Sequence, residues 1–306
     1  MIAYVFPGQG SQYSGMGKDL ADNFSVAKLV FEEANDTLGF DLAALCFTGS
    51  EADLKLTANT QPAILTTSIA ALRVLEQEVE MLPAYTAGHS LGEYSALVAA
   101  GAMSFADAVK IVRQRGTFMQ DAVPSGIGAM AAVMGIDRED LERLCEEAAE
   151  TEVVAVANYN SPGQSVIAGH ANAVARAIAL AKAKGAKRAL SLPVSAPFHS
   201  ALMAPAAQRL AEVLAPIQLS IFNCPVVSNV EAVPYQEMNR VKPLLIEQVC
   251  APVRWEESIL KLHDLNIDQY LEIGPGKVLS GLIKRIDSIA TVQNVGDVQS
   301  LAKLQN

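Results

Sequence analysis

Residues 88–92, Gly-His-Ser-Leu-Gly, have the pattern of a nucleophile elbow, a sharp turn from a strand into a helix that exposes a serine hydroxyl. Residues 83–87 can form the strand, and the apolar segment 91–100 is rich in helix formers. Glycine on each side of Ser90 avoids clashes across the turn, and the helix N-terminus favours a developing negative charge. The pattern predicts that Ser90 is a nucleophile that forms an ester; an ordinary helix-capping serine is the alternative.

A serine nucleophile needs a general base, because its hydroxyl is almost fully protonated at neutral pH. Of the four histidines, His89 adjoins the serine, and we expect the tight turn to point its ring away from the hydroxyl. His170 is expected at a helix start or a turn, and His263 on a solvated, charged helix face. His199 lies in the loop 193–200, which two prolines stiffen. Elimination favours His199 as the base, with a capping histidine as the alternative.

Acyl transfer to a serine also needs two backbone N–H groups that form an oxyanion hole. We expect one of them from Leu91, the residue after the nucleophile. The glycine-rich turn 7–10 suits the other, because its backbone can approach a ligand closely; a plain tight turn is the alternative. The segment 8–13 has Tyr13 where a dinucleotide fingerprint has its third glycine, so we exclude a nucleotide site.

Two arginines, Arg113 and Arg115, lie on the helix 105–122 that we predict after the elbow. Either could present its planar guanidinium to a carboxylate in a closed pocket. From the residues alone, a surface salt bridge is the favoured interpretation for both.

The composition is that of a compact globular protein, with 51% hydrophobic residues among 306, and the length suggests about two domains. The net charge of −10 argues against nucleic acid or an anionic membrane as the main partner. The apolar segment 2–6 is too short for a signal peptide, and we find no apolar stretch that could span a bilayer. We therefore expect a cytoplasmic protein with reduced, mostly buried cysteines: Cys46, Cys145, Cys224 and Cys250.

Strands and helices alternate at both ends of the chain, which predicts an α/β fold with a mostly parallel sheet flanked by helices. The expected strands are 2–6, 83–87 and 269–273, and the expected helices lie near 18–38, 62–77, 105–122, 201–214, 239–250, 253–265 and 278–285. Active sites in such sheets lie at the carboxyl ends of the strands, where both the turn 7–10 and the elbow are found.

The middle of the chain has a different pattern. We expect strands at 128–134, 153–159, 164–169 and 186–192, helices at 138–150 and 171–184, and a turn at 160–163. The order β-α-β-β-α-β predicts a small ferredoxin-like subdomain over residues 126–196. It is inserted into a larger catalytic domain formed by residues 1–125 and 197–306.

Several separate segments together carry a resemblance to one family. They are 8–12, 88–93, 114–116, 158–164, 197–200 and 272–276, and they occur in the right order over essentially the whole chain. The sequence resembles the malonyl-CoA:acyl carrier protein transacylases of fatty acid synthesis. The expected core is therefore a hydrolase-like α/β domain.

The resemblance implies a role for each matching residue. It implies Ser90 as the acylated nucleophile, His199 as its base, the backbone amides of Gln9 and Leu91 as the oxyanion hole, Arg115 as the partner of the malonyl carboxylate, the carbonyl of Gln248 as the group that orients His199, and Phe198 as bulk that disfavours an α-methyl branch. The family uses a Ser-His pair with a backbone carbonyl rather than a carboxylate triad.

The implied reaction moves the malonyl group from malonyl-CoA to the phosphopantetheine thiol of acyl carrier protein through a malonyl-serine intermediate. We expect ping-pong kinetics, no cofactor and no metal, a monomer, and two partners, the carrier and a coenzyme A thioester. An acyltransferase that serves a polyketide synthase is an alternative, and a serine thioesterase is a further one. A non-catalytic protein that only docks the carrier is disfavoured by Ser90, His199 and Arg115 together.

The carrier is expected to be acidic, so a local basic surface must overcome the net repulsion. One basic cluster lies in the small subdomain and the other near the C-terminus: Lys182, Lys184, Lys187 and Arg188, and Lys277, Lys284 and Arg285. We expect one cluster to border the cleft and dock the carrier; a solvated charged face is the alternative.

Overall fold

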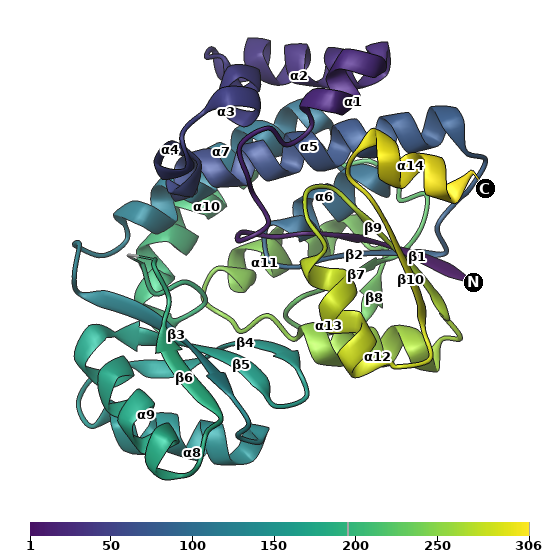
Figure 1. The fold of residues 1–306 in the computed structure, drawn as a ribbon. Helices are drawn as coiled ribbons and strands as arrows, with labels where there is room; N and C mark the ends of the chain where they lie inside the picture. Colours follow the sequence, from purple (N-terminus) through teal and green to yellow (C-terminus); the bar gives the residue numbers. More distant parts are fainter. Residues whose placement is uncertain (195, 306) are drawn as a thin grey trace.

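The computed structural model describes residues 1–194 and 196–305, and a large sheet organises most of them (Figure 1). Its six described strands have the order β10-β9-β1-β2-β7-β8. They are β1 (Ile2–Phe6), β2 (Tyr85–Gly88), β7 (Val226–Val227), β8 (Pro234–Tyr235), β9 (Gln269–Ile273) and β10 (Thr291–Val295). All neighbours are parallel except β7 and β8. The predicted α/β fold with a mostly parallel sheet is confirmed.

The register of the central strands brings two functional loops to one edge. In β1, Phe6 pairs with Gly88 of β2, and Val5 pairs with Glu272 of β9. Both β1 and β2 therefore end at the same height, and the turn after β1 lies beside the elbow after β2. In α/β proteins, binding and active sites lie where loops converge at the carboxyl ends of parallel strands.

Alternate residues of β1 enter two separate cores, as the period of a strand requires. Tyr4 and Phe6 pack under α5 (Thr57–Glu78), α6 (Gly92–Ala99) and α7 (Phe105–Asp121). Ala3 and Val5 face the other way, toward α12 (Trp255–Asp264) and α13 (Val278–Ile286). Figure 1 shows these helices on opposite faces of the sheet. Because it is covered on both faces, β1 is apolar throughout rather than alternating.

Several helical boundaries differ from the sequence prediction. The predicted helix 18–38 is divided into α1 (Lys18–Asn23) and α2 (Ser25–Leu38), because Phe24 adopts an extended conformation with φ −127°. Helix α5 begins five residues before Pro62, where we predicted its start. The prediction missed the short elements α3 (Leu42–Thr48), α4 (Glu51–Lys55) and α14 (Val298–Leu304) and the strands β7, β8 and β10.

Three further helical segments lie between residues 201 and 248. Residues predicted as one helix over 201–214 form a 3₁₀ turn at Ala201–Met203 followed by α10 (Ala204–Leu214). The predicted helix 239–250 is α11 (Met238–Gln248), which carries one site residue, Gln248, at its last position.

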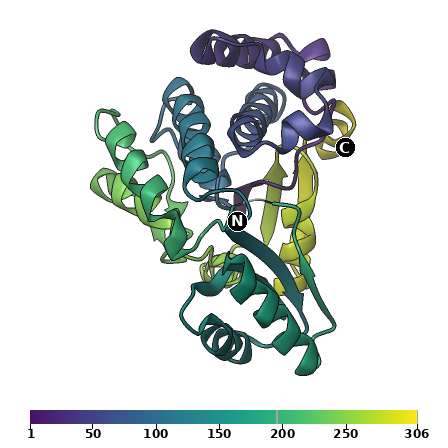
Figure 2. The ribbon, with the colours of Figure 1, turned by 90° about the vertical axis from the view of Figure 1, so that its left-hand side faces the viewer.

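A second, antiparallel sheet has the order β4-β5-β3-β6. Its elements are β3 (Gly128–Met134), α8 (Arg138–Ala149), β4 (Val154–Ser161), β5 (Gln164–His170), α9 (Ala171–Ala183) and β6 (Arg188–Ser191). Figures 1 and 2 show this sheet and its two helices beside the larger sheet. The predicted turn 160–163 is wrong by two residues, since β4 continues through Asn160 and Ser161.

Two further sequence expectations bear on the fold. Three of the cysteines are buried and Cys250 is half-buried, which confirms the prediction that they are mostly buried. Among residues 1–194 and 196–305, no helix has both the length and the apolar character that crossing a membrane requires.

Candidate active site

Ser90 lies on a turn that requires glycine two residues before it and two residues after it. A Cβ atom on Gly88 would lie 1.9 Å from the backbone of Gly92, and one on Gly92 would lie 2.2 Å from the carbonyl oxygen of Phe6. Ser90 itself has φ 53°, in the left-handed region that a residue with a side chain rarely adopts. The predicted strained elbow is confirmed. Leu91, not Ser90, is the N-cap residue of α6, so the helix-capping alternative is wrong.

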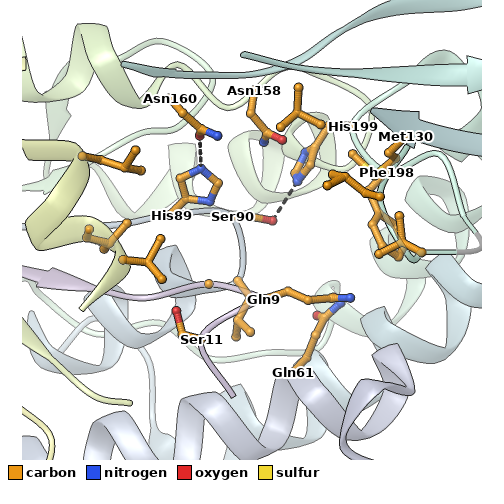
Figure 3. A pocket seen from close by; sticks show the side chains of 18 of the residues that line it. Gln9, Ser11, Gln61, His89, Ser90, Met130, Asn158, Asn160, Phe198 and His199 are labelled. Atoms are coloured by element: carbon orange, nitrogen blue, oxygen red, sulfur yellow. Dashed lines mark hydrogen bonds between the residues drawn. The ribbon is translucent and has the colours of Figure 1, made fainter. Parts of the chain in front are cut away.

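The hydroxyl of Ser90 and the imidazole of His199 are hydrogen-bonded, with 2.8 Å between Oγ and Nε2 (Figure 3). His199 is 5% exposed. Its Nδ1 lies 2.8 Å from the carbonyl oxygen of Gln248 and 3.2 Å from that of Ala251. Because carbonyl oxygens only accept, Nδ1 must carry the proton, and Nε2 is left with a free lone pair toward the serine.

Burial, and then the positive charge of Arg115, lower the pKa of His199 to about 3. The ring is therefore neutral at pH 7. A neutral imidazole whose Nε2 faces a hydroxyl can act as a general base.

Arg115 is 1% exposed and reaches the serine from α7. Its guanidinium donates to Gln61 Oε1 at 2.8 Å and to Gln248 Oε1 at 3.0 Å. It also lies 3.2 Å from Ser90 Oγ. Burial lowers its pKa from a very high ordinary value, and Arg115 remains a cation. No carboxylate of the described residues forms an ion pair with it, and its Nε has no partner there.

The surface salt bridge favoured for the two arginines is wrong in both cases. Arg113 donates to the carbonyl of Ala58 at 2.7 Å, contacts Asn59, and lies over the ring of Phe40. The helical period explains the divergence, because residues two apart on α7 face different sides. Only Arg115 lines the cavity that contains Ser90.

Gln9 and Leu91, the residues expected to form the oxyanion hole, lie on two loops that touch each other at this cavity. Both residues line it, and within the described part of the chain neither N–H donates to a protein group. The N–H of Ser90 is not free, because it donates to Asn229 Oδ1 at 2.6 Å. A Cβ atom on Gly8 would lie 2.3 Å from the carbonyl oxygen of His89, so glycine is required where the two loops touch.

The cavity has a volume of about 220 Å³ and two unlike sides (Figure 3). One side carries the polar groups of the elbow. The other is formed by residues of the four-stranded sheet, by Phe198 and by α13: Met130, Asn158, Asn160, Gln164, Val166, Val278, Leu279 and Leu282. Phe198 is 9% exposed and stands next to His199 in the chain. The arrangement brings the Ser90 hydroxyl, the Arg115 cation, Gln9 and Leu91 to one cavity.

A family model of the acyl transferase domain matches residues 3–306. The chain is 52% identical to the malonyl CoA-acyl carrier protein transacylase of Bacillus subtilis (strain 168), over 98% of this chain and 95% of the relative.

The chain belongs to the acyl transferase family.

Solved structures agree with this assignment over the whole chain. The crystal structure of an acyl carrier protein S-malonyltransferase from Vibrio cholerae is 49% identical, with a TM-score of 0.97 over 99% of each chain. A malonyl-transacylase in complex with a type II PKS acyl-carrier protein is 48% identical, with a TM-score of 0.97 over 100% of this chain and 99% of that one.

The other histidines of this acyl transferase lie apart from the serine hydroxyl. His89 turns away from Ser90, as predicted, and its Nε2 lies 2.8 Å from Asn160 Oδ1 (Figure 3). His170 is the N-cap residue of α9, which confirms the predicted helix start. His263 is not simply solvated, because its Nδ1 lies 2.8 Å from Asp287 Oδ2.

Sequence reasoning gave no role to three buried polar residues around Ser90 and His199. They are Gln61, Glu93 and Asn229, which are 1%, 0% and 2% exposed. Burial raises the pKa of Glu93 to about 7, although Asn229, Gln248, Arg115 and Tyr235 oppose the shift. The available signal was a carboxylate directly after the elbow glycine, inside an otherwise apolar helix. Asn229 follows a two-residue strand and carried no comparable signal.

Proposed function

We propose that this protein transfers a malonyl group from malonyl-CoA to the phosphopantetheine thiol of an acyl carrier protein, through an ester on Ser90. The names of the similar proteins support this substrate pair. The observation that carries the proposal is the position of Arg115. Its buried guanidinium lies 3.2 Å from Ser90 Oγ and lacks a counter-ion in direct contact among the described residues, because Gln248 lies between it and the carboxylate of Glu93. A substrate with a free carboxylate supplies that counter-ion.

In the first half of the reaction, Ser90 Oγ attacks the thioester carbonyl of malonyl-CoA while its proton moves to His199 Nε2. The carbonyl oxygen becomes an oxyanion that accepts from the amides of Gln9 and Leu91. The carbon–sulfur bond then breaks, and the coenzyme A sulfur leaves with the proton from His199. The products are malonyl-Ser90 and free coenzyme A.

In the second half, the carrier thiol gives its proton to His199 Nε2 and attacks the ester carbonyl. The bond to Ser90 Oγ breaks, and the serine recovers its proton from His199. The carbonyl of Gln248 holds the Nδ1 proton throughout, so the ring keeps one orientation. Because coenzyme A leaves before the carrier thiol attacks the malonyl ester, the reaction follows ping-pong kinetics.

Arg115 has two tasks in this mechanism. Its planar guanidinium pairs with the malonyl carboxylate, and Gln61 and Gln248 keep the guanidinium in place. The occupied pocket leaves water poorly placed to attack the ester. Phe198, which lines the same cavity, restricts the space for an α-methyl branch on the acyl group.

We also propose a domain description that supports this reaction. Residues 1–125 and 197–306 form a hydrolase-like catalytic domain, and residues 126–196 form a ferredoxin-like insert, within which Ser195 lies outside the described residues. The strand order β4-β5-β3-β6 and the separate core of the insert support the second assignment. The protein acts as a cytoplasmic monomer without a cofactor or a metal.

The docking surface for the carrier is the C-terminal basic cluster, Lys277, Lys284 and Arg285. All three are exposed around α13, and Val278, Leu279 and Leu282 of the same helix line the cavity. Arg285 also contacts Gln164, which lies on the cavity wall. A carrier held here presents its prosthetic arm to Ser90. Reversing the charge with Arg285→Glu should raise the apparent KM for the carrier several-fold, whereas Lys182→Glu in the other cluster should not.

Intact-protein mass spectrometry tests the reaction directly. Wild type incubated with malonyl-CoA should gain one malonyl group and lose it to the holo-carrier when the carrier is added. Ser90→Ala should gain none, and a persistent malonyl adduct in that variant would end the serine assignment. Rapid release of free malonate without any thiol acceptor would indicate a thioesterase instead.

A further inference from the structure

The backbone on both sides of His89 is held by one side chain from a distant part of the chain. Asn229 accepts from the N–H of Ser90 through Oδ1 at 2.6 Å and donates to the carbonyl of Gly88 through Nδ2 at 2.6 Å. It is 2% exposed and follows strand β7. These two contacts enclose the turn that carries the nucleophile.

The two contacts have the donor and acceptor pattern of a parallel β-bridge. Strand β2 pairs with β7 through Thr86 and Val226 and through Ala87 and Val227, where the backbone pairing ends. Beyond that point the side-chain amide of Asn229 offers one donor and one acceptor, as a peptide group does. It thereby continues the ladder past the end of β2 and into the elbow.

Asn229 is itself fixed by its backbone. Its N–H donates to Glu93 Oε2 at 3.0 Å, and its carbonyl accepts from the N–H of Arg254 at 3.0 Å. Glu93 is fully buried in the first turn of α6 and also accepts from Gln248 Nε2 at 2.7 Å. The Asn229 N–H and the Gln248 amide both donate to Glu93 Oε2, which ties the backbone of Asn229 to α6 and α11. Every polar group of Asn229 is therefore engaged.

We propose that Asn229 is a positioning residue for the nucleophile, holding Ser90 in its left-handed conformation so that Oγ faces His199. This inference rests on the proposed acyl transfer through Ser90. The contact also occupies the N–H of Ser90, so the oxyanion receives only the amides of Gln9 and Leu91. A left-handed residue with a side chain persists only where its surroundings hold it. Two buried side chains hold the backbone of Ser90: Asn229 accepts from its N–H at 2.6 Å, and Gln248 Nε2 donates to its carbonyl at 3.0 Å.

Positioning of the serine and positioning of the acyl group have different kinetic signatures. Loss of Asn229 disturbs the attack of Oγ on any donor, whereas loss of Arg115 disturbs only donors with a carboxylate. The rate constant for acylation of Asn229 variants should therefore fall by the same factor with malonyl-CoA and acetyl-CoA. The donor concentration that gives half of the maximal rate should change less than threefold.

Single-turnover acylation of Asn229→Ala, followed by mass spectrometry, measures that rate constant. The amount of folded enzyme sets only the amplitude of the acylation phase, so partial unfolding of the variant does not change the measured rate constant. We expect a fall of tenfold or more for both donors. Asn229→Asp keeps the side-chain size but cannot donate to Gly88 as a carboxylate, and its rate constant should also fall.

Ser228→Ala is the matched control. The Ser228 hydroxyl is equally buried in the same loop and accepts from Val230 and Glu231, but it does not touch the elbow. Its variant should keep the rate constant within twofold, whatever its melting temperature. Wild-type rate constants in both Asn229 variants, an equal fall in Ser228→Ala, or a fall with malonyl-CoA alone would each overturn the proposal.

Amide hydrogen exchange in the wild-type protein tests the contact without any variant. The Ser90 amide should exchange at least tenfold more slowly than that of Leu91, and equal exchange would overturn the proposal. If wild type forms no acyl-enzyme at all, the proposed function fails, and this exchange measurement still decides whether Asn229 holds the elbow.

Discussion

The two sheets contribute to the cavity in different ways. The six-stranded sheet brings polar groups to one edge, where Ser90, Gln9 and Arg115 lie close together. The four-stranded sheet contributes a wall of mixed character, in which Met130 and Val166 lie among the amides of Asn158, Asn160 and Gln164. Parallel strands end at a common edge with their loops converging, whereas an antiparallel sheet presents a face of side chains. The comparison assigns the chemistry to the first sheet and the shape of the cavity to the second, with the loop through Phe198 and His199 between them.

Removing the base should give the largest effect and is the most direct way to break this comparison. His199→Ala should lower the rate of Ser90 acylation by about 10²- to 10⁴-fold, because no other group accepts the proton of the hydroxyl. Quenched-flow mass spectrometry would measure the rate. His89→Ala, which removes an imidazole that turns away from the serine, should cost less than tenfold. Equal losses in the two variants would contradict the assignment of the base.

Arg115→Ala should separate binding from chemistry on the same edge of the sheet. Losing a buried charge-assisted hydrogen bond to the substrate carboxylate should lower kcat/KM for malonyl-CoA by about 10- to 100-fold. Acetyl-CoA, which has no carboxylate, should be used as well as by wild type. Arg113→Ala, on the same helix but outside the cavity, should change neither donor. A parallel loss with both donors would make Arg115 a structural residue.

The pH profile of acylation should show how well the cavity shields the base. With a pKa of about 3, His199 stays neutral as the pH falls from 7.5 to 5.5, so the rate should fall less than twofold. An ordinary histidine with a pKa near 6.5 would lose about tenfold. Glu93, with a pKa of about 7, titrates in the same range. An inflection that persists near pH 6.5 in Glu93→Gln would show that His199 is not shielded.

Changing the wall should give the smallest effect and should sharpen the division of roles. Phe198→Ala should raise the rate with methylmalonyl-CoA relative to malonyl-CoA by about threefold to tenfold, because the α-methyl group gains space. Competition between the two donors, with the acyl-enzymes weighed, would measure the ratio. Met130→Ala enlarges the cavity from strand β3. An equal gain in that variant would mean that volume alone, rather than Phe198, sets the preference.

The elbow could be predicted from the sequence because its requirements are local. Glycines at 88 and 92 and the change from strand to helix lie within a few residues, and the structure places Ser90 as expected. The two arginines were misjudged because burial depends on what α5 and α11 place above α7. No residue near Arg115 in the chain indicates that Gln61 and Gln248 are its hydrogen-bond partners.

Asn229 illustrates the same limit. It lies 139 residues from Ser90 in the chain, and its role arises only because β7 pairs with β2. The strands β7 and β10 escaped prediction, since one has two residues and the other is a partly exposed edge strand with polar residues. Short and edge strands carry little periodic signal of their own.

The sequence by itself determined the elbow at Ser90, the alternation of strands and helices, and the family, because turn geometry and apolar periodicity are short-range properties of the chain. The sequence also favoured His199 by elimination, but only the tertiary structure decided that both arginines lack salt bridges among the described residues, which polar residues surround Arg115, and which side chains hold the elbow. These are contacts between residues far apart in the chain, and they form only where packing of the two sheets brings them within hydrogen-bond distance.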